Sequence, residues 1–347
     1  MSTMYAGLDL HSNTTEIAVI NEDGEFIDNT RCATEAEALQ RALGRWSTDH
    51  TVWAVLEQGE QSYWAAARLA QIVDEVRICD PTDRSRRPGN KNDALDARQL
   101  ARRLRLGDTK HLYRPRMGRR MRFRRRFAYY ERATEEVKKQ IQYVKSQLRF
   151  WGVRIRKRAG WSRRKAARWL SQAPAEVRPD LQRLVDQLAR KRQWKRRAWE
   201  QVEELGSDYW EIDQFRRIPG VGPVRSHGLS ALLMDPHRFD SRSALYKYCR
   251  LAVQRRSTGG ELTAPEQLDR RGHGRLKAIT AGAVRSAVFR QTGDNEVKAF
   301  YHASLQRTGG RSTHAQLNTQ RKLLKTCWGL WKNETNYDPG RVRPDTG

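Results

Sequence analysis

The chain has 347 residues, enough for two or three domains. It carries 67 Lys and Arg residues against 40 Asp and Glu residues, and its formal net charge of +27 predicts a polyanionic partner. No stretch approaches the roughly 18 apolar residues of a membrane span, so we expect no membrane partner. The four cysteines are scattered and form no CxxC pair, so we expect no zinc site and no disulfides, and we expect the protein to work in a reducing cytoplasm.

The first 106 residues alternate between strand and helix patterns. Apolar-rich runs predict strands at 4–10, 15–20, 25–31, 51–57 and 76–80. Helical patterns lie between them at 35–46 and 62–73, and a last one follows at 92–106, capped by Asn92. A hairpin-led sheet followed by β-α units is the order of a ribonuclease-H-like α/β domain. We place this domain at residues 1–112.

The middle of the chain, 113–210, is basic and helical. Eight arginines fall within 114–126, interleaved with Met and Phe, and we expect them to bind phosphates: Arg114, Arg116, Arg119, Arg120, Arg122, Arg124, Arg125 and Arg126. Apolar residues then recur at spacings of three and four, as in a coiled-coil seam, at Val137, Ile141, Val144, Leu148 and Trp151. With a second helical stretch at 180–205 they predict a helical hairpin, whose seam either associates with a second subunit or packs inside one.

Residues 211–332 predict a compact, mostly helical domain with Gly-rich loops, and the polar segment 333–347 predicts a disordered tail. The Pro-Gly-x-Gly-Pro turn at 219–223 is typical of a helix-hairpin-helix unit. Gly220 and Gly222 would let the backbone approach a DNA phosphate, although an ordinary turn between helices is the simpler alternative.

Four carboxylates occupy positions where a metal site is expected. Asp9 and Glu57 end two predicted strands, and Asp93 and Asp96 share one face at the start of a helix. Clustered carboxylates repel one another unless a cation neutralises them, and oxygen ligands suit Mg²⁺ or Mn²⁺. Taken singly, each acid could instead stabilise a turn or a helix N-terminus. His11 and His273 lie near motifs, but as lone histidines they fit polar surface groups.

Several motifs around these acids resemble those of a known family. The segments are "GLDLHS" at 7–12, "VLEQGE" at 55–60, "VRICDP" at 76–81 and "KNDALDARQLA" at 91–101. They resemble the DEDD transposases of the insertion-sequence-110 type, related to the Piv and MooV-like proteins, whose amino-terminal domain is similar to the RuvC resolvase. The resemblance implies that Asp9, Glu57, Asp93 and Asp96 are catalytic ligands of Mg²⁺ or Mn²⁺. Gln58 and Gly59 depart from the Thr-Gly that usually follows the glutamate.

The resemblance extends into the carboxy-terminal half. The segment 250–260, "RLAVQRRSTGG", matches the part of the family in which a serine before glycine attacks DNA, which implies Ser257, favoured as the less hindered hydroxyl, or Thr258 as nucleophile. Arg255 and Arg256 would bind the scissile phosphate. The basic segment "RRGHGRLK" at 270–277 also matches the family, and we expect it to contact nucleic acid through Arg271, His273, Arg275 and Lys277.

The resemblance further implies partners and a reaction. The chain would be a prokaryotic, cytoplasmic recombinase, associated with the nucleoid when active, that cleaves and exchanges strands of donor and target DNA. It would act as a dimer that pairs into a tetramer, guided by a bridge RNA. Three alternatives remain open: a hydrolytic RuvC-like nuclease that shares the acids but needs no serine, an ATPase of the sugar-kinase or actin type, and an RNA-binding protein without catalytic activity.

Overall fold

The computed structural model describes residues 1–80, 93–109, 112, 118–156, 159–258, 261–269 and 271–342, and for 254–258 and 261–266 it describes the backbone alone. The chain divides into two units, Met1–Gly118 and Arg119–Gly347, each with its own hydrophobic core. Asn92, the predicted cap, lies outside the described residues.

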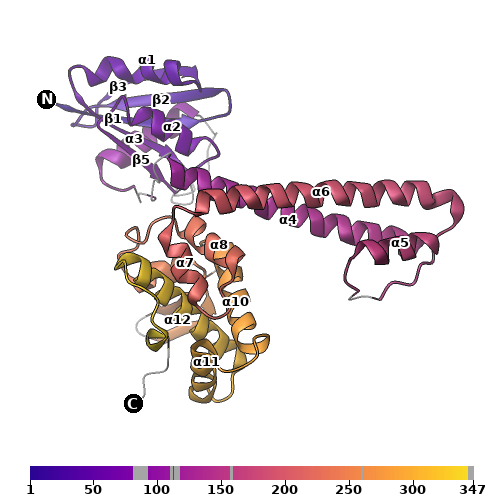
Figure 1. Ribbon diagram of the computed structural model, residues 1–347. Coiled ribbons are helices and arrows are strands. Elements are labelled where there is room, and N and C mark those ends of the chain that lie inside the picture. The colour runs from indigo at the N-terminus through magenta and orange to yellow at the C-terminus, as the bar shows by residue number, and fades with distance from the viewer. Residues whose placement is uncertain are drawn as a thin grey trace. The chain divides into compact units, whose positions relative to one another are not determined.

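The first unit is built on a mixed sheet (Figure 1). Its strands are β1 (Thr3–Leu10), β2 (Thr14–Ile20), β3 (Phe26–Ala33), β4 (Thr51–Glu57) and β5 (Glu75–Cys79), in the spatial order β3-β2-β1-β4-β5. β1 pairs antiparallel with β2 and parallel with β4, and β5 continues the parallel half. The predicted order of strands and helices is confirmed.

Helices cover both faces of this sheet. α1 (Ala36–Ser47) and α2 (Ser62–Leu69) pack on one face, where Met4, Ala6 and Leu8 of β1 join their core. α3 (Asp93–Arg105) packs on the other face through Leu100 and Leu104, against Val55 and Cys79. Successive residues of a strand point to opposite faces of the sheet. The buried residues therefore show on which face the side chain at the end of each strand lies.

Gly7 lets α3 lie directly on β1. A Cβ atom at residue 7 would lie 2.0 Å from the carbonyl oxygen of Ala97 and 2.5 Å from the amide nitrogen of Ala101, and no such atom fits there. Ala97 and Ala101 are themselves fully buried, so small side chains on the helix complete the contact. The start of α3 is therefore held close to the end of β1.

The second unit begins with the predicted helical hairpin. α4 (Arg119–Phe150) and α6 (Arg178–Gly206) lie side by side, and α4 alone is about 48 Å long at roughly 1.5 Å per residue (Figure 1). Val137, Val144 and Leu148 of the predicted seam are buried, and the Gln140 side chain donates a hydrogen bond to the Leu184 carbonyl oxygen at 3.1 Å. Ile141 is only partly buried and Trp151 is exposed, so most but not all of the seam packs inside one chain, one of the two alternatives that the sequence leaves open.

Short helices close the far end of the hairpin. α5 (Arg163–Ser171) and the 3-10 turn η2 (Ala175–Val177) form a small core with the hairpin, built around Val144, Leu148, Trp169 and Leu181. Among the described residues, no helix is both long and apolar enough to cross a bilayer.

The remainder of this unit packs around the base of the hairpin. It consists of α7 (Trp210–Arg217), α8 (Pro223–Leu233), α9 (Arg242–Tyr248), α10 (Gly274–Phe289), α11 (Glu296–Arg307), α12 (Ser312–Lys332) and the hairpin of β6 (Val253–Thr258) with β7 (Glu261–Leu268). Phe123 and Phe127 of α4 belong to its core. The mostly helical character is confirmed, but residues 253–258, for which no strand was predicted, form a strand. Pro265 and charged residues in its partner obscure the strand pattern.

The expected disordered tail does not hold for residues 333–342. Val342 is buried in the core, and the backbone N–H of Tyr337 donates to the side chain of Gln214 at 3.0 Å. The Tyr337 hydroxyl bonds to Glu296, and Pro339–Arg341 form the 3-10 turn η3. The segment is polar overall, but the side chains of Tyr337 and Val342 anchor it to the domain, and two such contacts are enough to order a short segment.

The close approach at Gly7 generates a stability prediction. Gly7→Ala is expected to destabilise the first unit by about 1–3 kcal/mol, because α3 must move away from β1 to admit the methyl group. Hydrogen exchange of the amides in β1 and α3 of the full chain measures the effect.

Gly44→Ala is the matched control. A Cβ at residue 44 meets only the Cγ2 atom of Ile72 at 3.9 Å, and Gly44 lies inside α1, so alanine there should stabilise by about 1 kcal/mol. Equal exchange rates for Gly7→Ala and the wild type would contradict the packing of α3 on β1.

Candidate metal centre

Asp9 and Glu57 end two neighbouring parallel strands. The register of β1 and β4 runs to the pair Leu8 and Leu56, so the two carboxylates follow at the same edge of the sheet. Both residues line one cavity of about 360 Å³. By the alternation along each strand, both lie on the face covered by α3.

Asp93 and Asp96 come from the first turn of α3. Because Gly7 holds this helix against β1, its first turn lies beside the end of that strand. Asp93 reaches the site directly: its Oδ2 atom lies 3.3 Å from Nε2 of His11. Asp96 follows one turn further along the helix, and Asp93 and Asp96 are both partly exposed.

His11 lies between the two aspartates. Its Nε2 atom is 3.4 Å from Oδ2 of Asp9 and 3.3 Å from Oδ2 of Asp93, and it is buried without a hydrogen-bond partner among the described residues. A turn joining β1 to β2, closed by the bond from the His11 N–H to the Thr14 carbonyl oxygen, holds the residue there. The sequence indicated a polar surface group, and the side chain is indeed 42% exposed. The signal for its place at the site was its position two residues after Asp9.

The arrangement fits a divalent cation. The ligand atoms of Asp9, His11 and Asp93 all lie within 4.8 Å of one another. Glu57 shares the cavity with Asp9, whereas Glu57 and Asp96 are not part of that close group of three. Two carboxylates and an imidazole nitrogen are a donor set that Mn²⁺ and similar metals accept, and Nε2 of His11, close to both carboxylates, is the nitrogen that would complete it.

The predicted hydroxyls lie in the second unit, on strand β6. Ser257 is opposite Leu262 and Thr258 is opposite Glu261 in the antiparallel pair with β7. The backbones of Arg255 and Arg256 belong to the same strand, which shifts register around Arg256. The side chains of these four residues lie outside the described part of the structure, as do Gly259 and Gly260.

Some arginines of the arginine-rich segment are used inside the domain. Arg120 donates a hydrogen bond to Oε1 of the buried Glu211 at 2.7 Å, and its guanidinium lies 3.6 Å from the ring centre of Tyr209. This corrects its assignment to nucleic acid, since a buried carboxylate needs a paired cation. Arg119 pairs with Asp208, and Arg124 contacts the sulfur of Met234.

Other arginines of the segment face solvent. α4 buries Met121, Phe123 and Phe127 and exposes Arg122, Arg125 and Arg126, as an amphipathic helix does. None of the three exposed arginines pairs with a carboxylate of the described residues. Arg114 and Arg116 lie outside the described residues.

The basic side chains of segment 271–277 are less available to nucleic acid than the sequence indicates. Arg271 pairs with Asp269 at 3.2 Å, and Arg275 pairs with Glu131 of α4. Burial and the nearby charges of Arg124, Arg238 and Arg250 lower the pKa of His273 to about 4, so its ring is neutral at pH 7 and adds no positive charge. Lys277 lies in the first turn of α10 and is partly exposed.

The predicted Pro-Gly-x-Gly-Pro turn joins α7 to α8. Gly220 has a positive φ of 82°, and a Cβ there would lie 2.2 Å from the carbonyl oxygen of Ala283, so glycine is required for both conformation and space. Gly222 precedes the first turn of α8, whose amides receive no side-chain cap. The turn therefore holds α8 against α10.

Two family models match the chain. Residues 6–151 match a transposase model of the DEDD, IS110 type, and residues 212–302 match a model described as transposase, IS116/IS110/IS902 family. The first span includes Asp9, Glu57, Asp93 and Asp96, and the second includes Ser257, Thr258 and the turn at Gly220. A search of curated proteins found no match.

Proposed function

The chain belongs to the DEDD transposases of the IS110 family, and on this premise we propose that it cleaves and exchanges DNA strands by phosphodiester transfer. The observation that carries the proposal is the convergence of Asp9, His11 and Asp93, with Glu57 on the cavity that Asp9 and His11 line, in a chain of net charge +27. Carboxylates gathered in one place suit metal-assisted chemistry on a polyanion better than a purely structural role.

Asp9, Glu57, Asp93 and Asp96 would hold Mg²⁺ or Mn²⁺. The bound ion would neutralise charge on a phosphodiester and lower the pKa of an oxygen nucleophile or leaving group. Gly7 and the alanines of α3 would keep Asp93 within reach of Asp9, and the turn after β1 would orient His11. The protein's own contribution at this site is therefore the fixed spacing of its ligands.

A hydroxyl of β6 would be the nucleophile. The oxygen of Ser257, or of Thr258, would form a bond to phosphorus as the bond from phosphorus to the leaving strand breaks, and the hydroxyl proton would pass to the leaving oxygen. The protein and the DNA would then be joined by a phosphodiester bond. The hydroxyl of another strand could attack this phosphorus, join the strands and release the side-chain hydroxyl. Arg255 and Arg256 beside it would stabilise charge developing on the phosphate.

A hydrolytic nuclease is the competing function, because it uses the same acids with water as nucleophile. The two functions predict different products. Exchange leaves a covalent protein–DNA adduct, whereas hydrolysis leaves free strand ends.

We expect Ser257→Ala to abolish the covalent adduct with DNA and with it strand exchange, because the attacking oxygen is lost. Thr258→Ala should keep most of both, and Ser146→Ala, on the exposed face of α4, is the control. Denaturing gels of the protein with labelled DNA measure the adduct.

Unchanged cutting by the double variant Ser257→Ala/Thr258→Ala, with no adduct in the wild type, would assign the chain to the nucleases. Loss of the adduct in Thr258→Ala alone would reverse the choice of nucleophile.

We also propose that the protein acts as a homo-oligomer guided by RNA. The support is the family resemblance, the excess of basic residues, and apolar side chains left exposed on the hairpin, among them Tyr143, Phe150 and Trp194. Since most of the seam is already used inside the chain, these exposed side chains offer a surface to a second copy.

Purified from its host, the protein is expected to carry one defined small RNA and to have the mass of a dimer or larger. Sequencing of the copurified RNA and light scattering measure this. A monomer with only heterogeneous nucleic acid, removed by high salt, would contradict both partners.

A further inference from the structure

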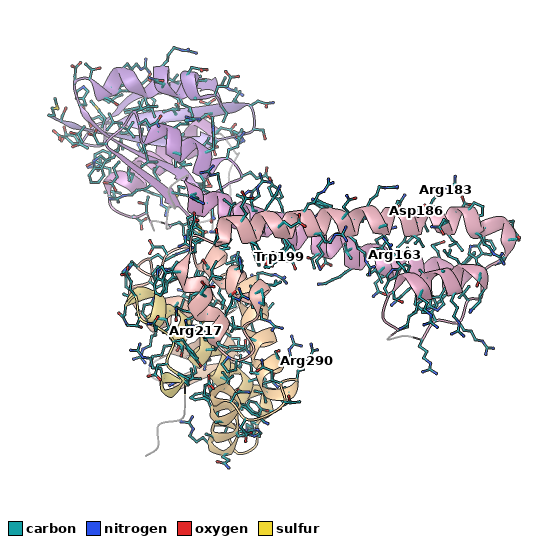
Figure 2. The ribbon with its side chains drawn as sticks, viewed as in Figure 1. Arg163, Arg183, Asp186, Trp199, Arg217 and Arg290 are labelled. Carbon is teal, nitrogen blue, oxygen red and sulfur yellow. The ribbon has the colours of Figure 1, made fainter. Side chains whose placement is uncertain are left out.

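A basic pocket surrounds the turn between α7 and α8. Its volume is about 650 Å³, and its walls come from the end of α7, the turn at 218–222, the start of α8, the end of α10 and the loop that follows α10. Four arginines line it: Arg216, Arg217, Arg225 and Arg290. Figure 2 labels Arg217 at the end of α7 and Arg290 at the end of α10.

Contacts within the protein hold one of these arginines in a fixed position. Arg225 is partly buried, and its Nη1 donates to the carbonyl oxygen of Gly220 at 2.7 Å. Its guanidinium also lies against Gly282 of α10, where a Cβ would meet Nε at 3.2 Å. Glycines at 220 and 282 thus allow one arginine to be held in place between three elements, with the other three around it.

The positive charges in the pocket lack anionic partners. Within the described part of the chain, no carboxylate forms an ion pair with any of the four arginines, and the one acid of the lining, Asp294, pairs with Lys298 at 3.4 Å. Burial is the main cause of the lowered pKa of Arg225, and repulsion from the charges of Arg290 and Arg285 lowers it further. An anion entering the pocket would relieve this repulsion.

The lining favours a duplex backbone over unpaired bases. It contains no aromatic side chain on which a base could stack, and stacking is how single strands are usually held. Arginines with glycine-rich backbone are the groups that contact phosphates without reading sequence. The pocket also falls within the transposase match at 212–302.

We propose that this pocket binds a backbone phosphate of duplex DNA, with Arg216, Arg217, Arg225 and Arg290 as its ligands. The proposal rests on the DNA-directed function proposed above, and it extends the contact expected from Gly220 and Gly222 to four arginines at α7, α8 and the end of α10. It requires no metal and no reactive hydroxyl, so it can be tested apart from the chemistry.

The test uses Arg217→Ala/Arg290→Ala in the full-length protein. Both side chains are exposed and make no hydrogen bond within the described residues, so the fold should be kept, as circular dichroism would verify. Anisotropy titrations with labelled DNA duplexes of several sequences should show affinity lowered about tenfold for every sequence. The slope of log affinity against log salt should fall by about one per lost contact.

The matched control is Arg45→Ala/Arg183→Ala. It removes the same charge from two arginines that already pair with Asp28 and Asp180, so it should leave the slope nearly unchanged. Equal behaviour of the two double variants would overturn the pocket. If Arg217→Ala/Arg290→Ala lost affinity for an RNA duplex but not for a DNA duplex, the choice of DNA would be overturned.

Failure of this inference differs from failure of the proposed function. If only the pocket is misassigned, Arg217→Ala/Arg290→Ala cleaves DNA and binds it like the wild type. If the proposed function is misassigned, the wild type forms no adduct even where the pocket variant loses DNA affinity.

Discussion

The contact between α3 and the backbone of β1 at Gly7 is the constraint on which the candidate metal centre depends. Asp9 and Asp93 are 84 residues apart in sequence, and only the packing of this helix on this strand brings them to one imidazole. Any side chain at residue 7 would separate them. The gathered carboxylates repel one another, so packing supplies the free energy that holds them together until a cation does.

The excess of positive charge is divided between structure and surface. Arg120 neutralises the buried Glu211, and Arg271 and Arg275 pair with neighbouring acids, so a count of arginines overstates what is open to nucleic acid. Arg122, Arg125 and Arg126 on α4, and the four arginines of the pocket at the α7–α8 turn, remain without such partners among the described residues. These two surfaces are among those that could offer charge to a polyanion.

Local patterns in the sequence predicted much of the fold, because the strands and helices of the first unit alternate cleanly and each acid falls at the end of an element. They failed where a residue acts through distant partners. His11 has no periodic signal, and its proximity to Asp93 arises only from the packing of α3. The strand at 253–258 depends on pairing with a segment that contains Pro265, and Tyr337 is anchored by Gln214 and Glu296 far along the chain.

We propose that residues remote in sequence bind one divalent ion in the first unit. Titration of the full-length protein with Mn²⁺, followed by electron paramagnetic resonance, tests it most directly. The wild type should bind at a saturable site, and Asp9→Asn or Asp93→Asn should weaken that site by more than about tenfold. Asp49→Asn, an exposed acid outside the site, should leave it intact. Equal Mn²⁺ binding by all four proteins would contradict the account.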